Sequence, residues 1–292
     1  MSFDHESGVQ SRLVPKHGER FNIRAAFTLV ELLVVVAILS LLASLLLPGL
    51  ARAQAKRKAV YCFNNLRQLG IALQIYAGDH DDSLPYNMGT DGTHRTVAAK
   101  GFLNWANNVM TWELDSENTN AFYLKAGGLG PYVGSNHRLF KCPSDIALSG
   151  VQKEAGWTER VRSVSMNAML GNAGEFMQGG GNTNNPTYRQ FLRQGNIPAP
   201  SRIFALVEEH PDSINDGYFL NKFYSRVWID LPASYHNGSA NFVFADGHAE
   251  SHRWLIRGTM PAAKPDAAEL PRPVPSNEKA DLSWVLSRTS VE

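Results

Sequence analysis

The chain has 292 residues, and its 28 basic and 27 acidic side chains give a formal net charge of +1. This balance does not indicate a nucleic-acid partner or a polybasic membrane contact, because phosphate binding needs a clustered positive field. A hydrophobic content of 43% excludes wholesale disorder, and 24 Gly with 15 Pro favour a loop-rich body with β-structure. Two cysteines are too few for a four-cysteine zinc site.

Residues 27–47 form an apolar segment that contains one charged side chain, Glu31. As a helix this segment spans roughly 30 Å, the hydrocarbon thickness of a bilayer, and it has no polar stripe. The sequence therefore predicts a transmembrane helix. Pro48 and Gly49 could end it, but residues 51–59 are strong helix formers and apolar residues recur every three or four positions up to Tyr76. This pattern predicts one long helix that spans residues 27–79.

Three interpretations of the apolar segment compete. A secretory signal cut after Ala53 would have a shorter apolar core than this one. A plain signal anchor leaves Glu31 unexplained, since a carboxylate in lipid costs about 3 kcal/mol. A prepilin signal explains both features, because its helix is kept after cleavage and its acidic side chain has a partner.

The residues from Ala26 to Glu31, Ala-Phe-Thr-Leu-Val-Glu, closely resemble the cleavage motif of type IV pilins and type II secretion pseudopilins. The resemblance implies that residues 1–26 are a leader, cut before Phe27 by a prepilin peptidase that also methylates the new amine. It also implies that Glu31 neutralises the Phe27 amine of a neighbouring subunit. Ala26 departs from the family pattern, which has Gly at this position.

Further stretches resemble a branch of pilin-like proteins from planctomycete- and verrucomicrobia-type bacteria. These stretches are residues 62–76, residues 140–145, residues 213–219, and the motif of His236, Asp246 and Gly247. The resemblance implies an α+β fold of the pilin-like type, in which the long N-terminal transmembrane helix packs on an antiparallel β-sheet head.

The rest of the chain predicts an α+β head over 80–258 and a Pro-rich linker with a C-terminal segment over 259–292. Residues 203–207 read as a buried strand, and residues 172–186 as a long exposed loop. Residues 241–245 and 248–254 form a predicted hairpin, because Asp246 and Gly247 suit its two-residue turn. Residues 281–286 would dock on the head as a short helix or strand.

Cys62 and Cys142 have two possible states. The pilin resemblance places the head in the periplasm, where two thiols are expected to form a disulfide. The alternative is two unpaired buried thiols. No ligand spacing around either cysteine indicates a metal site or a catalytic pair.

A zinc site could be drawn at the predicted hairpin. His248, Glu250 and His252 share one face of an extended strand, with His236 and Asp246 close by in the chain. We favour a structural role, in which His236 and Asp246 hydrogen-bond the hairpin and the alternating face meets solvent.

A calcium site is the stronger metal hypothesis. Oxygen-bearing side chains crowd the loop after the strand at 203–207, and Ca²⁺ prefers such hard ligands. The candidates are Glu208, Asp212, Asn215 and Asp216, with Glu209 beside them. Major pseudopilins carry a calcium loop in a similar place, although this loop does not match theirs residue by residue. The alternative is a turn capped by its own Asp and Asn side chains.

These features predict a structural subunit rather than an enzyme, since no nucleophile motif, phosphate loop or zinc-protease motif appears. The expected partners are the membrane, a prepilin peptidase, other pseudopilin subunits and a secretion assembly platform, in a homo-oligomeric fibre with no nucleic acid. The expected location is the bacterial inner membrane, with the head in the periplasm and the assembled fibre there or at the cell surface. The alternatives are a type IV pilus subunit for adhesion or uptake, and a membrane-tethered hydrolase or glycan-binding head. Exposed Trp and Tyr side chains within 100–135 would favour glycan binding.

Overall fold

The computed structural model describes residues 28–265 and 267–292. The first element is a single helix, α1 (Leu29–Asp79), which continues through Pro48 and Gly49 as the helix-forming composition of 51–59 predicted. The chain divides into two compact units, Met1–Leu50 and Ala51–Glu292. The first described half of α1 therefore belongs to one unit, and its second half belongs to the head.

The head is built on a five-stranded sheet in the order β5-β1-β4-β7-β8. Its strands are β1 (Val164–Asn167), β4 (Phe204–Glu208), β5 (Tyr218–Phe219), β7 (Ser239–Phe244) and β8 (Ala249–Arg253). All neighbours are antiparallel except β1 and β5, which are parallel, so the sheet is mixed rather than wholly antiparallel. The chain leaves β4 and returns on the far side of β1, so β5 runs opposite to β4 and along β1.

Shorter elements surround this sheet. The remaining helices are α2 (Thr90–Ala98), α3 (Phe122–Lys125), α4 (Gly150–Glu154) and α5 (Ala280–Leu286). Two-stranded ladders join β2 (Met177–Gln178) to β3 (Gly181–Asn182) and β6 (Val227–Trp228) to β9 (Arg272–Pro273). Short 3-10 helices lie at Ser116–Asn118, Pro131–Val133, His137–Phe140, Gly174–Phe176, Gln194–Asn196, Arg257–Thr259 and Ser276–Glu278.

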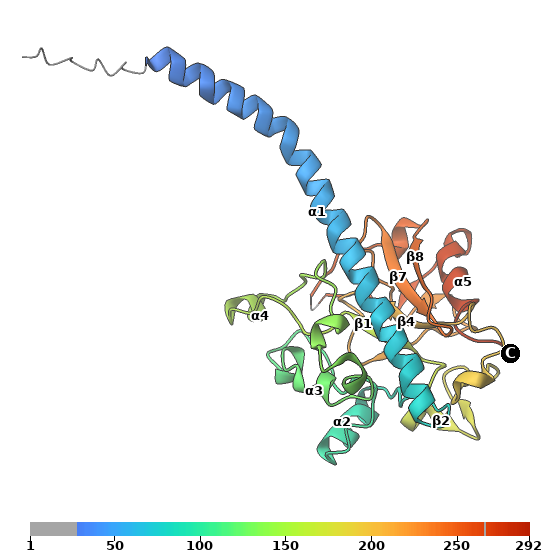
Figure 1. Cartoon of the computed structure of the whole chain (residues 1–292). Coiled ribbons are helices and arrows are strands. Elements are labelled where there is room, and N and C mark those ends of the chain that lie inside the picture. Colours follow the sequence, from blue (N-terminus) through green and yellow to red (C-terminus); the bar gives the residue numbers. More distant parts are fainter. Residues whose placement is uncertain (1–27, 266) are drawn as a thin grey trace, which may run out of the picture. The chain divides into compact units, whose positions relative to one another are not determined.

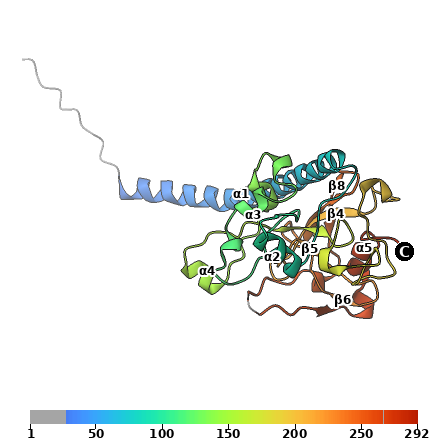
Figure 2. The same cartoon turned by 90° about the horizontal axis from the view of Figure 1, so that it is seen from below.

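The second half of α1 covers one face of the sheet (Figure 1). Leu66, Leu69 and Leu73 of this helix share a buried cluster with Val243 of β7. The other face of β7 belongs to a second cluster, which includes Leu282 and Val285 of α5. Figure 2 shows α5 on the opposite side of the sheet from this half of α1. Both faces of the sheet are therefore buried at its inner strands β1, β4 and β7, whereas the edge strand β8 is partly exposed.

The predicted hairpin is formed by β7 and β8, which pair from Ser239 with Arg253 to Val243 with Ala249. Gly247 adopts φ +89° in the turn, which explains why glycine suits this position. The predicted strand at 203–207 is β4, displaced by one residue. The C-terminal segment at 281–286 is the helix α5.

Residues 259–292 pack into the same compact unit as the rest of the head. The Val274 N–H donates to the Arg226 carbonyl, and the neighbouring β9 pairs with β6. The predicted linker therefore contributes a strand to the head, because its apolar side chains find partners there.

Candidate functional site

The described chain opens with a reciprocal cap between Thr28 and Glu31. The Thr28 N–H and hydroxyl donate to Glu31 Oε2 at 2.9 and 2.7 Å, and the Glu31 N–H donates to Thr28 Oγ1 at 3.2 Å. This is a capping box, which satisfies N–H groups left free at a helix start. The leader 1–26 and the predicted cleavage residues Ala26 and Phe27 lie outside the described residues.

The first half of α1 presents an apolar surface on all sides. The side chains of residues 29–47 are all exposed, and an 18-residue window of the helix has a mean hydropathy of 2.8 with none of it buried. Glu31 is the one charged residue in this segment. The segment is long and apolar enough to cross a membrane, and it fits a single-pass anchor.

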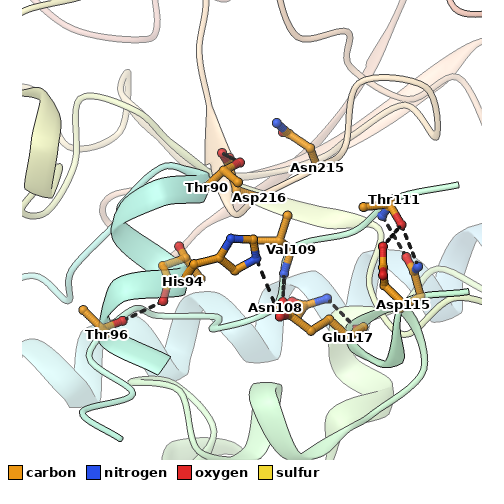
Figure 3. A network of polar contacts seen from close by, with 12 residues as sticks. Thr90, His94, Thr96, Asn108, Val109, Thr111, Asp115, Glu117, Asn215 and Asp216 are labelled. Carbon is orange, nitrogen blue, oxygen red and sulfur yellow. Dashed lines mark hydrogen bonds and ion pairs between the residues drawn. The ribbon is translucent and has the colours of Figure 1, made fainter. Parts of the chain in front are cut away.

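The predicted calcium ligands in the loop after β4 make separate contacts. Both carboxylate oxygens of Asp212 accept from the Lys264 N–H at 2.9 Å. Asp216 accepts from the Thr90 hydroxyl at 3.0 Å, and Figure 3 shows these two residues side by side. Asp216 also accepts from the Tyr218 N–H at 2.9 Å. Among the described residues, neither aspartate joins a group of three potential metal-ligating side chains. Calcium binding therefore stays a prediction.

The remaining calcium candidates, Asn215 and Glu208, also contact other parts of the head. The Asn215 carbonyl accepts from the Met110 N–H at 2.5 Å and from the buried Arg162 guanidinium at 3.3 Å. Glu208, the last residue of β4, contacts His236 instead, with its Oε1 3.1 Å from Nε2. The loop is thus anchored by hydrogen bonds to several parts of the head.

Several buried ionisable side chains surround this loop. Burial, with a contribution from Asp216, raises the pKa of Glu209 to about 8, although hydrogen bonds to serine hydroxyls and the charge of Arg162 oppose the shift. Burial likewise raises the pKa of Asp230, and Glu209 adds to that effect. Burial also lowers the pKa of the Arg162 guanidinium to about 10. The acids are held in a closed polar core rather than displayed to solvent.

The hairpin histidines make structural contacts instead of meeting at a metal site. His248 stacks on Phe244, and its Nδ1 lies 2.6 Å from Asp246 Oδ1, which also accepts the His248 N–H. His252 stacks on Trp284 of α5 with ring centroids 3.7 Å apart. Asp246 thus orders the turn, as the structural alternative for this motif expects.

Hydrogen bonds and an ion pair around Glu117 stabilise the region before α3. Glu117 Oε2 accepts from the Val109 N–H at 2.6 Å, and Oε1 lies 3.6 Å from His94 Nε2 of α2. Nearby, the Thr111 hydroxyl donates to Asp115 at 2.7 Å. Figure 3 shows these contacts linking α2 to the neighbouring loop. They stabilise a loop, with no cluster of ligand atoms at their centre.

The aromatic residues within 100–135 do not form an exposed platform. Trp105 is fully buried, and its indole N–H donates to Asn87 Oδ1 at 3.1 Å. The Arg160 guanidinium lies over the half-buried Trp112 ring. Phe122 is exposed, but it has no indole or phenol group. Tyr123 and Tyr132 are half-buried, as Trp112 is, so only Trp105 counts against glycan binding by the exposure criterion.

Four potential ligand side chains from distant parts of the chain meet beside β4. Cys62 and Cys142 form a disulfide with their Cα atoms 5.2 Å apart. His236 Nε2 lies 3.6 Å from Cys142 Sγ and 3.1 Å from Glu208 Oε1. The ligand atoms of all four residues lie within 4.8 Å of one another. Sequence spacing did not reveal this cluster, because its members come from α1, β4 and two loops.

A family model for the prokaryotic N-terminal methylation motif matches residues 22–47. No curated protein and no solved structure matches the chain. The matched segment contains the predicted cleavage site and the apolar half of α1. The match supports a type IV pilin-like or pseudopilin subunit, which implies processing by a prepilin peptidase and assembly with other pilin subunits. It indicates a structural role rather than an enzymatic one.

Proposed function

We propose that the chain is a structural subunit of a pseudopilus for type II protein secretion. Cleavage before Phe27 would release the leader, and methylation of the new amine would follow. The observation that carries this proposal is the coincidence of the methylation motif with the first half of α1, where the side chains of residues 29–47 are all exposed. Such a surface needs lipid before assembly and other helices within the fibre, where packing replaces lipid contacts.

Assembly would pair the amine of Phe27 with Glu31 of a neighbouring subunit. Each charge is costly alone in an apolar environment, and pairing removes most of that cost. The capping contacts from Thr28 go to Glu31 Oε2. Oε1 is the atom that would receive the neighbouring amine, so the same carboxylate can start the helix and accept a second subunit.

The location follows from the same proposal. The leader would stay on the cytoplasmic side of the inner membrane, and the head would lie in the periplasm. The Cys62–Cys142 disulfide supports an oxidising compartment for the head. The partners would be the prepilin peptidase, further pseudopilins and the assembly platform. A type IV pilus for adhesion or uptake is the nearest alternative use of the same fibre chemistry.

N-terminal mass analysis of the membrane-extracted protein tests the proposal. We expect a methylated Phe27 as the first residue, because the aromatic residue lies at the cleavage position of the motif. The same chain made in cells without prepilin peptidase should keep Met1. A mature start at Gln54 in cells with the peptidase would identify a secretory signal and exclude fibre assembly.

A further inference from the structure

The cluster beside β4 has the geometry of a metal site. Cys142 Sγ and Glu208 Oε1 both approach the same ring nitrogen, Nε2 of His236, at 3.6 and 3.1 Å. In a catalytic triad of thiol, imidazole and carboxylate, the sulfur and the carboxylate would contact different ring nitrogens of the histidine. A tetrahedral zinc ion instead holds nitrogen and sulfur about 3.6 Å apart, and nitrogen and oxygen about 3.4 Å apart. These two separations fit the second arrangement. The two sulfurs are bonded to each other in this structure, so reduction must let them move to about 3.8 Å apart before both can bind one ion.

Burial and chemistry point to the same ion. Cys62 and Cys142 are each 2% exposed, and Glu208 is 1% exposed. A buried carboxylate needs a compensating positive charge. The other oxygen of Glu208 accepts from the Asn241 N–H at 2.9 Å, a contact that orients the carboxylate as outer partners of metal ligands do. Two thiolates, an imidazole and a carboxylate suit Zn²⁺ rather than Ca²⁺ or Mg²⁺.

We propose that reduction of the Cys62–Cys142 bond turns this cluster into a closed Zn²⁺ site, with Cys62, Cys142, Glu208 and His236 as its four ligands. A dithiol reductant is oxidised to a disulfide while the protein disulfide breaks and each sulfur takes up a proton. Zinc binding then releases these two protons to solvent. Tyr61, Lys141 and Pro143, which adjoin the two cysteines in the chain, line a cavity of about 780 Å³, and we infer that reductant and ion enter from this side.

The consequence is that this cluster crosslinks α1 to the loop that carries Cys142 in both redox states, by a disulfide or by a zinc ion. In the oxidised chain the disulfide joins α1 to the loop that carries Cys142. In the reduced chain zinc joins these elements and adds β4 and the loop before β7. The contact between α1 and the sheet is therefore kept in both redox states.

Metal titration of the full-length chain in detergent tests the proposal. The protein is reduced with dithiothreitol, freed of it under anaerobic conditions, and titrated with Co²⁺ as the probe. We expect about one Co²⁺ per chain with thiolate charge-transfer absorption, displaced by Zn²⁺. The oxidised chain should show no such absorption, because its sulfurs are bonded to each other.

Variants identify the ligands. His236→Ala and Glu208→Gln should each weaken Co²⁺ binding at least about tenfold. His248→Ala and Glu250→Gln are matched controls on the hairpin and should bind as the wild type does. A reduced wild-type chain with no more thiolate absorption than the Cys62→Ser, Cys142→Ser double variant overturns the proposal, whether or not it stays folded. Binding that survives both His236→Ala and Glu208→Gln, or that is lost in the hairpin controls, overturns the ligand set.

Discussion

Glu209, the residue that follows β4, is 1% exposed, and its Oε1 has no hydrogen-bond partner within the described residues. Burial is the main reason that its pKa rises from 4.5 to about 8, with Asp216 adding to the shift. Asp230 lies close enough for Glu209 to raise its pKa as well. The charge of the nearby Arg162 opposes the shift, but the effect of burial is larger.

Glu209→Gln should change how stability depends on pH. Between the unfolded pKa of 4.5 and the folded pKa of about 8, the native state holds a proton that the unfolded state has lost. The wild type should therefore lose stability as pH rises through this range and level off above it. The variant should melt higher than the wild type at about pH 8 and show a shallower decline from about pH 5.

Thermal melting of the detergent-solubilised chain across this pH range measures the effect of Glu209→Gln. The exposed Glu250→Gln serves as the control, and its curve should follow the wild type. Parallel curves for Glu209→Gln and the wild type would show that Glu209 titrates normally in the folded protein.

The Glu31 side chain has two roles that variants can separate, as a helix cap and as the charge that would pair with the Phe27 amine. Glu31→Gln keeps a capping-box side chain but removes the charge, whereas Glu31→Leu removes both. Both variants should insert into the membrane, since neither carries a charge at this position into the apolar region. Both should shorten the ladder of crosslinked subunits, because the Phe27 amine loses its partner. A normal ladder for Glu31→Gln with a defect only for Glu31→Leu would assign the effect to the helix cap.

At the scale of elements, the second half of α1 packs closely on β7. A Cβ added at Gly70 would overlap a methyl group of Val243, so the helix approaches the strand only because this residue is glycine. On the next strand, a bulge between Phe204 and Leu206 changes the register of β4 against β7. Ala205 and Leu206 consequently both pack in the cluster under α1, although they are adjacent in a strand.

Gly70→Ala should destabilise the head by about 1–3 kcal/mol, because the added methyl overpacks this contact. Gly78→Ala is the matched control in the same helix, since no atom lies within 4 Å of its added Cβ. The control should be neutral or stabilise by up to about 1 kcal/mol through helix propensity. Combining Gly70→Ala with Val243→Ala should recover part of the loss, measured as a less than additive change in melting temperature. Equal melting temperatures for the two glycine variants would contradict the close contact.

At the scale of the whole molecule, the two units that meet at Leu50 differ in where their apolar side chains lie. Among the described residues of the unit before it, 29–47 expose their side chains behind the Thr28–Glu31 cap, which suits lipid or a bundle of other helices. The unit after it buries its apolar side chains on both faces of one sheet. The Cys62–Cys142 bond spans 80 residues of this second unit, and loop closure on that scale is worth about 4 kcal/mol. The head is thus tied to α1 by a covalent bond as well as by packing.

Local patterns in the sequence determined the parts of this protein that depend on neighbouring residues. The apolar run at 27–47, with Glu31 as its one charge, predicts a membrane helix because a helix with no polar stripe needs apolar surroundings on every side. The methylation motif predicts processing, because a peptidase reads a short segment. The Asp246-Gly247 turn predicts the β7–β8 hairpin, since only two residues join its strands.

The tertiary structure alone decided which distant side chains meet. Asp212 and Asp216 are four residues apart, yet packing turns one toward Lys264 and the other toward Thr90. Glu208 and His236 are 28 residues apart, and His236 and Cys142 are 94 apart, yet their ligand atoms meet beside β4. The strand order decides this, because it brings α1, β4 and the loop before β7 to one place, and no spacing within a single element encodes that order.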